Sequence, residues 1–310
     1  RVALLLERAE DAARAGWADV AREAVVEASQ VAADLGLGAD DAAARRCRMV
    51  EGELGLLIGD FVGARRRFLQ VAGSRSHASL AEALAHDAVD DLTVHACARA
   101  LVAAAAAATA TVEADTNGPD SLDVVCNLIP PLLARFGTTS TSSPVALRRA
   151  ARVHEGVAHV RVAQGQPDAA LAHLRAALGF DLERGDALDA ATVALMTAEL
   201  RCAHDPRAAA TLAADVHAML SGQGLLRTTV RLDLLHAHLA LIAGDAFAAA
   251  RRAAVAACRA EALNVAPDAV AAWTVVGRAA EALHDERGAW EARQACARWT
   301  RRARRQLGKD

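Results

Sequence analysis

The feature of this sequence that most restricts its fold is an interruption of helical periodicity that recurs about every 40 residues. Apolar residues recur at three- and four-residue intervals, which is typical of amphipathic helices, and no stretch shows convincing two-residue alternation. The interruptions fall at Gly16, Gly59, Gly165, His204, Gly244 and His284, which are 43, 106, 39, 40 and 40 residues apart. A period of this length is typical of helical hairpins stacked in sequence order.

A second repeated pattern describes how the two helices of each hairpin pack. A small residue stands five positions after a break and another stands seven positions before it. The residues after the breaks are Ala21, Ala64, Ala170, Ala249 and Ala289, and those before are Ala9, Gly52, Ala158, Thr197, Ala237 and Gly277. Small side chains let two helices approach closely, and a glycine at the break can adopt the left-handed conformation that ends a helix.

The interval of 106 residues between Gly59 and Gly165 leaves room for another hairpin, which we expect to turn at "TNGPDS" (116–121). The periodicity predicts helices over 1–14, 17–34, 39–58, 61–72, 78–114 and 121–135, and eight more between 145 and 306. The segment "GTTSTSSP" (137–144) is interpreted as a hinge or as a long loop between helices. The prediction is an all-α chain of about seven antiparallel hairpins, divided into 1–136, the segment 137–144, and 145–310.

Composition excludes several classes of protein and favours close helix packing. Hydrophobic residues make up 54% of the 310 residues but aromatic residues only 3%, so the core must be built from Ala, Leu and Val. The net charge of −3 argues against a global nucleic-acid-binding field. The six cysteines show no CxxC spacing, which argues against a zinc ribbon and suits a reducing, cytoplasmic compartment.

The most apolar run, 98–114, contains Arg99 and Glu113 and is too short for a membrane span, so we expect a buried helix. "HEGVAH" places His154 and His159 five residues apart, about 140° around a helix, whereas a zincin helix needs two His on one face. No phosphate-binding loop, dinucleotide fingerprint or nucleophile elbow occurs in the sequence. We therefore predict no enzyme, no cofactor and no metal site.

The last hairpin resembles the tetratricopeptide repeat family. Trp273, Val276, Gly277, Ala280 and Ala289 follow that family's Trp-x2-Leu-Gly-x2-Tyr…Ala pattern, with Val for Leu and Ala for Tyr. The period of about 40 is longer than the family's 34, and the closing Pro is missing. Longer, degenerate repeats of this kind are similar to the effector-sensing regions of MalT-like bacterial signalling regulators. The basic end "ARWTRRARRQLG" is similar to the segment that precedes the DNA-binding domain in such regulators.

The resemblance implies a right-handed superhelix whose first helices line a concave groove. The groove positions lie one place after the small packing residue or three places before it: Met49, Glu53, Glu155, His159, Leu234, His238, Thr274 and Arg278. The expected ligand is a protein, a peptide or a small effector. A homodimer is a further option, and no membrane or nucleic-acid partner is expected. The predicted function is the sensor region of a larger regulator; the alternatives are a stand-alone scaffold and, less favoured, an enzyme with a pocket between the two halves.

Overall fold

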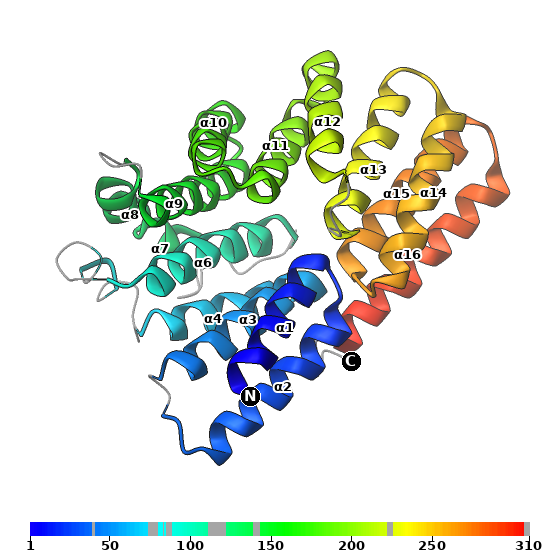
Figure 1. Ribbon diagram of the computed structural model, residues 1–310. Helices are drawn as coiled ribbons and strands as arrows, with labels where there is room; N and C mark the ends of the chain where they lie inside the picture. Colours follow the sequence, from blue (N-terminus) through cyan, green and yellow to red (C-terminus); the bar gives the residue numbers. More distant parts are fainter. Residues whose placement is uncertain are drawn as a thin grey trace. The chain divides into compact units, whose positions relative to one another are not determined.

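The computed structural model describes residues 1–38, 41–73, 80–82, 84, 89–110, 122–138, 143–221 and 226–306. These residues form fifteen helices and contain no strand (Figure 1). The helices are α1 (Val2–Ala15), α2 (Ala18–Asp34), α3 (Ala42–Ile58), α4 (Phe61–Val71), α6 (Asp91–Ala110), α7 (Leu122–Cys126), α8 (Ile129–Phe136), α9 (Pro144–Ala163), α10 (Pro167–Arg184), α11 (Ala187–Arg201), α12 (Pro206–Leu220), α13 (Leu226–Ile242), α14 (Ala246–Ala262), α15 (Ala266–Ala282) and α16 (Glu286–Gln306). The predicted all-α fold of successive helical hairpins is confirmed.

The hairpin turns have the backbone conformation that the sequence pattern predicts. The φ angles are positive at Gly16, Gly59, Gly165, Gly244 and His284, with values of 93°, 87°, 70°, 80° and 57°. The turn near His204 is made differently, because α11 ends at Arg201 and Asp205 caps the next helix by accepting a hydrogen bond from the Ala208 N–H at 3.0 Å. Each break is therefore a helix stop, and a left-handed residue is one of two ways of making it.

An aspartate directly after the break starts the second helix of four hairpins. Asp60, Asp205, Asp245 and Asp285 each accept a hydrogen bond from the backbone N–H three residues later, at 2.9 to 3.1 Å. A side chain in this position satisfies a helix N–H that has no partner within the helix. The pairs Gly-Asp and His-Asp thus end one helix and begin the next.

The predicted helix over 121–135 is two short helices in the structure. α7 ends at Cys126 and α8 begins at Ile129, with Pro130 and Pro131 in its first turn. Proline is tolerated in the first turn of a helix but not in its interior, so one continuous helix cannot form here. The predicted turn at 116–121 lies outside the described residues, and the predicted helix over 78–114 is described as α6 from Asp91 onward.

The described chain divides into two compact units. The first comprises Arg1–Glu10, Arg22–Leu56 and Asp60–Val193, and the second comprises Asp11–Ala21, Leu57–Gly59 and Ala194–Asp310. The main division thus falls inside α11, whereas the sequence placed it in 137–144. The reason is that Leu132 and Phe136, before that segment, share one apolar cluster with Val153 and Val157, after it. The segment 137–144, of which 139–142 is not described, therefore connects helices of the same unit.

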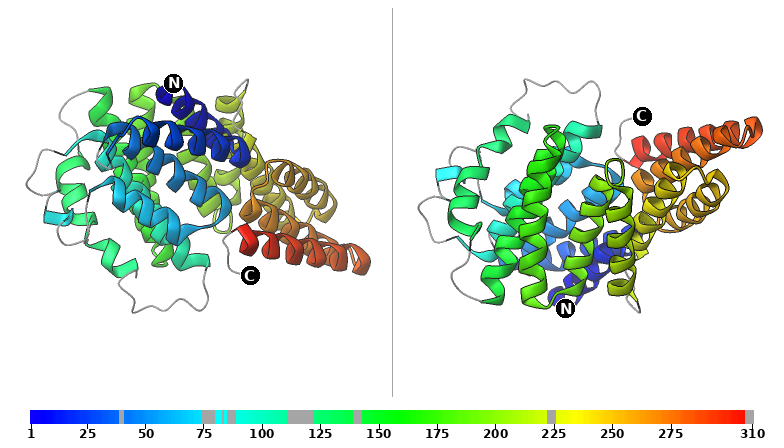
Figure 2. Two further views of the ribbon diagram at one scale, coloured as in Figure 1. Left: turned by 90° about the horizontal axis from the view of Figure 1, so that it is seen from below. Right: turned by 90° about the horizontal axis from the view of Figure 1, so that it is seen from above.

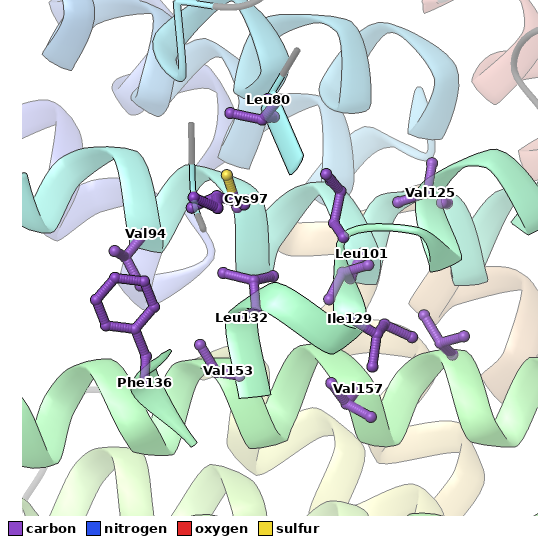
Figure 3. Packing of buried hydrophobic residues seen from close by; sticks show 14 of the residues in the cluster. Leu80, Val94, Cys97, Leu101, Val125, Ile129, Leu132, Phe136, Val153 and Val157 are labelled. Carbon is purple, nitrogen blue, oxygen red and sulfur yellow. The ribbon is translucent and has the colours of Figure 1, made fainter. Parts of the chain in front are cut away.

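The core of the first unit lies on both sides of α6. Val94, Cys97 and Leu101 point toward α8 and α9, where Leu132 and Val157 pack against them (Figure 3). Alanines 96, 100 and 103 of α6 belong instead to a cluster with α3 and α4. By length and composition alone, Asp91–Thr109 passes as a candidate membrane span, yet 56% of it is buried inside the protein. Packing on two sides explains why nearly every position of this helix is apolar and small.

The core of the second unit is built from alanines between successive helices. Helices α13 to α16, yellow to red, run side by side in both views of Figure 2. Ala249, Ala253, Ala256, Ala257 and Ala260 of α14 are fully buried, and Ala289 of α16 is 3% exposed. The small residues that follow the breaks therefore lie where the helices of a hairpin meet.

Candidate functional site

In the first unit, arginines and carboxylates connect the first helices of successive hairpins in a row. We call Glu53, Arg99, Glu155, Arg152 and Asp189 the charged row. Glu53 of α3 accepts two hydrogen bonds of 2.6 Å from the guanidinium of Arg99 on α6. Arg99 also lies 3.6 Å from Glu155 of α9, and Arg152 of α9 bonds to Asp189 of α11 at 2.9 Å. The ion pairs link α3, α6, α9 and α11 in sequence order.

Partial burial makes these charges interact strongly. The side chain of Glu155 is 11% exposed and that of Arg99 16%. Burial by itself raises the pKa of Glu155, but the neighbouring Arg152 and Arg99 outweigh burial and hold this pKa below its usual value. Burial likewise lowers the pKa of Arg152, and Glu155 and Asp189 outweigh it in the other direction. Glu155 is therefore an ionised acceptor between two guanidinium groups.

The charged row extends to α10 through Arg184. Its Nη2 atom lies 2.8 Å from Asp189 and 3.0 Å from Asp181. Burial, followed by the charge of Asp189, raises the pKa of Asp181 to about 6, although Arg184 opposes the shift. Asp181 thus titrates close to neutral pH, beside the row.

The second unit has a related arrangement on α11, α13 and α15. Arg231 of α13 donates hydrogen bonds of 3.1 and 2.5 Å to the two carboxylate oxygens of Glu199 on α11. One turn and a half further along α13, His238 donates from Nδ1 to the Leu234 carbonyl at 3.0 Å, so its Nε2 is the acceptor when the ring is neutral. Burial lowers the pKa of His238, and the positive charge of Arg278 on α15 lowers it further.

The eight predicted groove residues separate into two sets by burial. The positions one place after the small packing residue are partly exposed at Glu53, His159 and His238 and exposed at Arg278. The positions three places before it are buried at Met49, Glu155 and Leu234, and only Thr274 is exposed. Met49 and Leu234 belong to apolar clusters with neighbouring helices. The two positions differ by about 40° around a helix, enough to turn one of them toward the adjoining hairpin.

The structure brings some of the predicted residues together. Glu53 and Glu155 meet through Arg99, and His159 lies close enough to Glu155 to lower its pKa. In the second unit, His238 is bonded to Leu234 and is coupled electrostatically to Arg278. Whether these residues contact a ligand remains a prediction.

The arginines of the charged row were not predicted, although the sequence holds a signal for three such residues. Arg46, Arg152 and Arg231 each stand 13 residues before a break. Each pairs with a carboxylate of a neighbouring first helix: Glu10, Asp189 and Glu199 respectively. Arg99 lies in the long interval where no break was assigned, so an alignment of the breaks could not find it.

Other side chains singled out in the sequence have contacts of their own. His154 lies against His173 of α10, away from His159, and Asp91 forms an ion pair with Arg149. Asp87 lies outside the described residues, and within them no group of three or more His, Cys, Asp or Glu is placed to hold a metal ion. Arg302 of the basic C-terminal helix stacks over Trp299, with its guanidinium carbon 4.9 Å from the ring centroid.

Comparison with known proteins supports the fold. Neither the protein-family models nor the curated proteins match this sequence. The fold is similar to that of BtubC (BKLC) from P. vanneervenii, at 18% identity over 80% of this chain and 93% of the other, with a TM-score of 0.52. A Rap protein complexed with competence and sporulation factor aligns with 98% of this chain and 99% of its own, at 12% identity, with a TM-score of 0.44. At such identities, likeness extends to the fold alone, and a TM-score below 0.5 supports no conclusion.

The fold and the repeated breaks together define the class of this molecule. It is a helical-repeat protein, built from hairpins that bury their apolar sides against one another.

Proposed function

We propose that this chain is a protein- or peptide-binding module without catalytic activity. One observation carries the proposal. On four first helices, the position after the small packing residue is polar and at least partly exposed: Glu53, His159, His238 and Arg278. Hydrogen-bonding groups repeated from one helix to the next suit an extended ligand, because each repeat offers it one contact.

We further propose that the module is the sensor region of a larger bacterial signalling or transcription regulator of the MalT-like kind, acting in the cytoplasm. The support is the repeat length of about 40 residues and the degeneracy of the repeats. The alternative is a scaffold that holds other proteins together. A sensor binds its partner differently with and without an effector, whereas a scaffold binds its partners constitutively, so effector dependence separates the two.

The test is to capture partners with the immobilised chain from a lysate of the source organism, identify them by mass spectrometry, and measure the affinity for the purified partner. The variant Arg278→Glu reverses an exposed charge at a predicted contact position on α15. We expect it to weaken binding about tenfold, equivalent to about 1.4 kcal/mol. The matched control is Arg251→Glu, an exposed residue on α14, the second helix of its hairpin. Equal affinity in both variants would place the contact elsewhere.

A further inference from the structure

Two histidines in the first unit form a hydrogen-bonded pair that takes no part in the charged row. His154 lies on α9 and His173 on α10, the two helices of the hairpin that turns at Gly165. Their Nδ1 atoms are 2.8 Å apart. The other ring nitrogen of His154, Nε2, lies 2.8 Å from the carbonyl oxygen of Gly137, at the C-terminal end of α8.

The contact with Gly137 determines where the protons of the neutral pair lie. A carbonyl oxygen only accepts, so Nε2 of His154 carries a hydrogen. A neutral imidazole has one N–H, and Nδ1 of His154 is therefore an acceptor. It follows that Nδ1 of His173 is the donor, and that Nε2 of His173 is the nitrogen without a hydrogen. Hydrogen bonds then run from His173 to His154 to Gly137 and connect α10, α9 and the end of α8.

The surroundings of the pair oppose positive charge. Burial lowers the pKa of His173, and His154 and Arg161 of α9 lower it further. From α10, the ring of Phe180 lies 5.9 Å from that of His154, centroid to centroid. From α8, the pair is faced by the uncharged carbonyl of Gly137. Of these neighbours, the apolar ring does not stabilise a charged imidazole by ion pairing and the guanidinium repels it.

We propose that the His154–His173 pair is an acid-sensitive brace that holds α9, α10 and the end of α8 together. A first added proton binds Nε2 of His173 and leaves the hydrogen bond between the two Nδ1 atoms in place. A second proton can bind only at Nδ1 of His154, which turns the acceptor into a donor. That step breaks the bond and leaves two positive rings side by side, so the brace is closed at neutral pH and opens in acid.

The sign of the effect on stability follows from the direction of the shift. A histidine whose pKa is lower in the folded state contributes its full stability above about 6.5, the pKa of the unfolded chain. That contribution is lost as the pH falls from there toward the folded-state pKa. Because the two rings share a hydrogen bond, the protons bind in two steps that belong to the pair.

The first test is nuclear magnetic resonance of the imidazole nitrogens in the full chain. We expect His154 to carry its hydrogen at Nε2 and His173 at Nδ1, with both rings titrating together and below about 6.5. Finding His173 protonated at Nε2 instead, or two rings that titrate independently near the ordinary value, would overturn the proposal.

The second test is hydrogen exchange between pH 7 and pH 5, corrected for the intrinsic rate. In the wild type, we expect exchange in α8 and α10 to rise about tenfold as the brace opens. His173→Asn places an amide donor that does not titrate near Nδ1 of His154, so the rise should disappear. His154→Gln keeps a donor for Gly137 but removes the pair, so exchange should be fast at both pH values. His204→Gln, at an exposed turn, is the control; a pH response that survives in His173→Asn contradicts the brace.

Discussion

Glycine has a second use in this chain, at places where two helices cross with their backbones in contact. A Cβ atom added to Gly156 of α9 would lie 2.7 Å from the carbonyl oxygen of Ala98 on α6. A Cβ atom added to Gly277 of α15 would lie 3.5 Å from the Cβ of Ala292 on α16, an ordinary contact distance. The two buried glycines look alike in the sequence, but only Gly156 has no room for a methyl group.

We therefore predict opposite outcomes for the same substitution. Gly156→Ala should destabilise the protein by about 1–3 kcal/mol, because the backbone of Ala98 must move away. Gly277→Ala should be neutral or stabilising by up to about 1 kcal/mol, since alanine favours the helix more than glycine does. Urea unfolding midpoints of the two variants measure the difference. Equal losses of stability would mean that the α6–α9 crossing is not in backbone contact.

Asp181 is the carboxyl group that should make stability depend on pH near neutrality. Its side chain is 3% exposed, and burial together with Asp189 raises its pKa to about 6. A carboxyl group whose pKa is raised by folding stabilises the folded state below the unfolded value of about 4. This contribution is lost as the pH rises through 6.

Asp181→Asn should remove that dependence while keeping an acceptor for Arg184. We predict that the variant gains stability relative to the wild type between pH 4.5 and 7.5, by on the order of 2 kcal/mol. Asp168→Asn, an exposed carboxyl on the same helix, is the control and should show a nearly constant difference. Urea unfolding at a series of pH values measures both; parallel curves for Asp181→Asn and the wild type would count against a raised pKa.

At the scale of the helix, the last hairpin is fastened by one carboxylate oxygen. Oε1 of Glu261 on α14 accepts a hydrogen bond from the indole N–H of Trp273 on α15 at 2.8 Å. The same atom accepts from the indole N–H of Trp299 on α16 at 2.6 Å. Trp273 thus joins three helices through its polar edge, in addition to the packing role that its place in the repeat pattern predicts.

Removing this acceptor should loosen α15 and α16. Glu261→Ala leaves two partly or fully buried indole N–H groups unsatisfied, at an expected cost of about 1–3 kcal/mol. Glu261→Gln keeps an oxygen in the same place and should cost under about 1 kcal/mol, the difference between a charged and a neutral acceptor. Thermal unfolding compares the two. A variant pair with equal loss would show that the charge, and not the acceptor, matters.

The breaks between first and second helices could be predicted because glycine and Gly-Asp pairs mark them in the sequence. The ends of the second helices were harder to find. α10 ends at Gly185 with φ of 75°, and the residue of positive φ after α14 is Asn264 with φ of 57°, and neither belongs to the repeated break pattern. The polar face followed the same division. Residues next to a small packing position could be aligned, whereas the arginine partner of Glu53 lies on a helix whose break falls within 111–121, which is not described.

For the whole molecule, the arrangement in units determines how far a local change can spread. Each core cluster joins neighbouring helices only: one contains α13 to α16, and another contains α3, α4 and α6. In repeat proteins of this kind, stability is close to a sum of the repeats and their nearest-neighbour interfaces. Local opening should therefore be confined to the helices next to a perturbation.

Glu261→Ala offers the sharpest test, because its contacts lie entirely within α14, α15 and α16. We predict that hydrogen exchange rises about tenfold or more in α14 to α16, consistent with a loss of about 1–3 kcal/mol. Exchange in α4, α6 and α9 should match the wild type, and Glu261→Gln should leave both regions unchanged. Exchange followed peptide by peptide by mass spectrometry resolves these helices. An equal rise in α6 would show that the chain opens as a single cooperative unit, in which case its stability is not a sum of separate repeats.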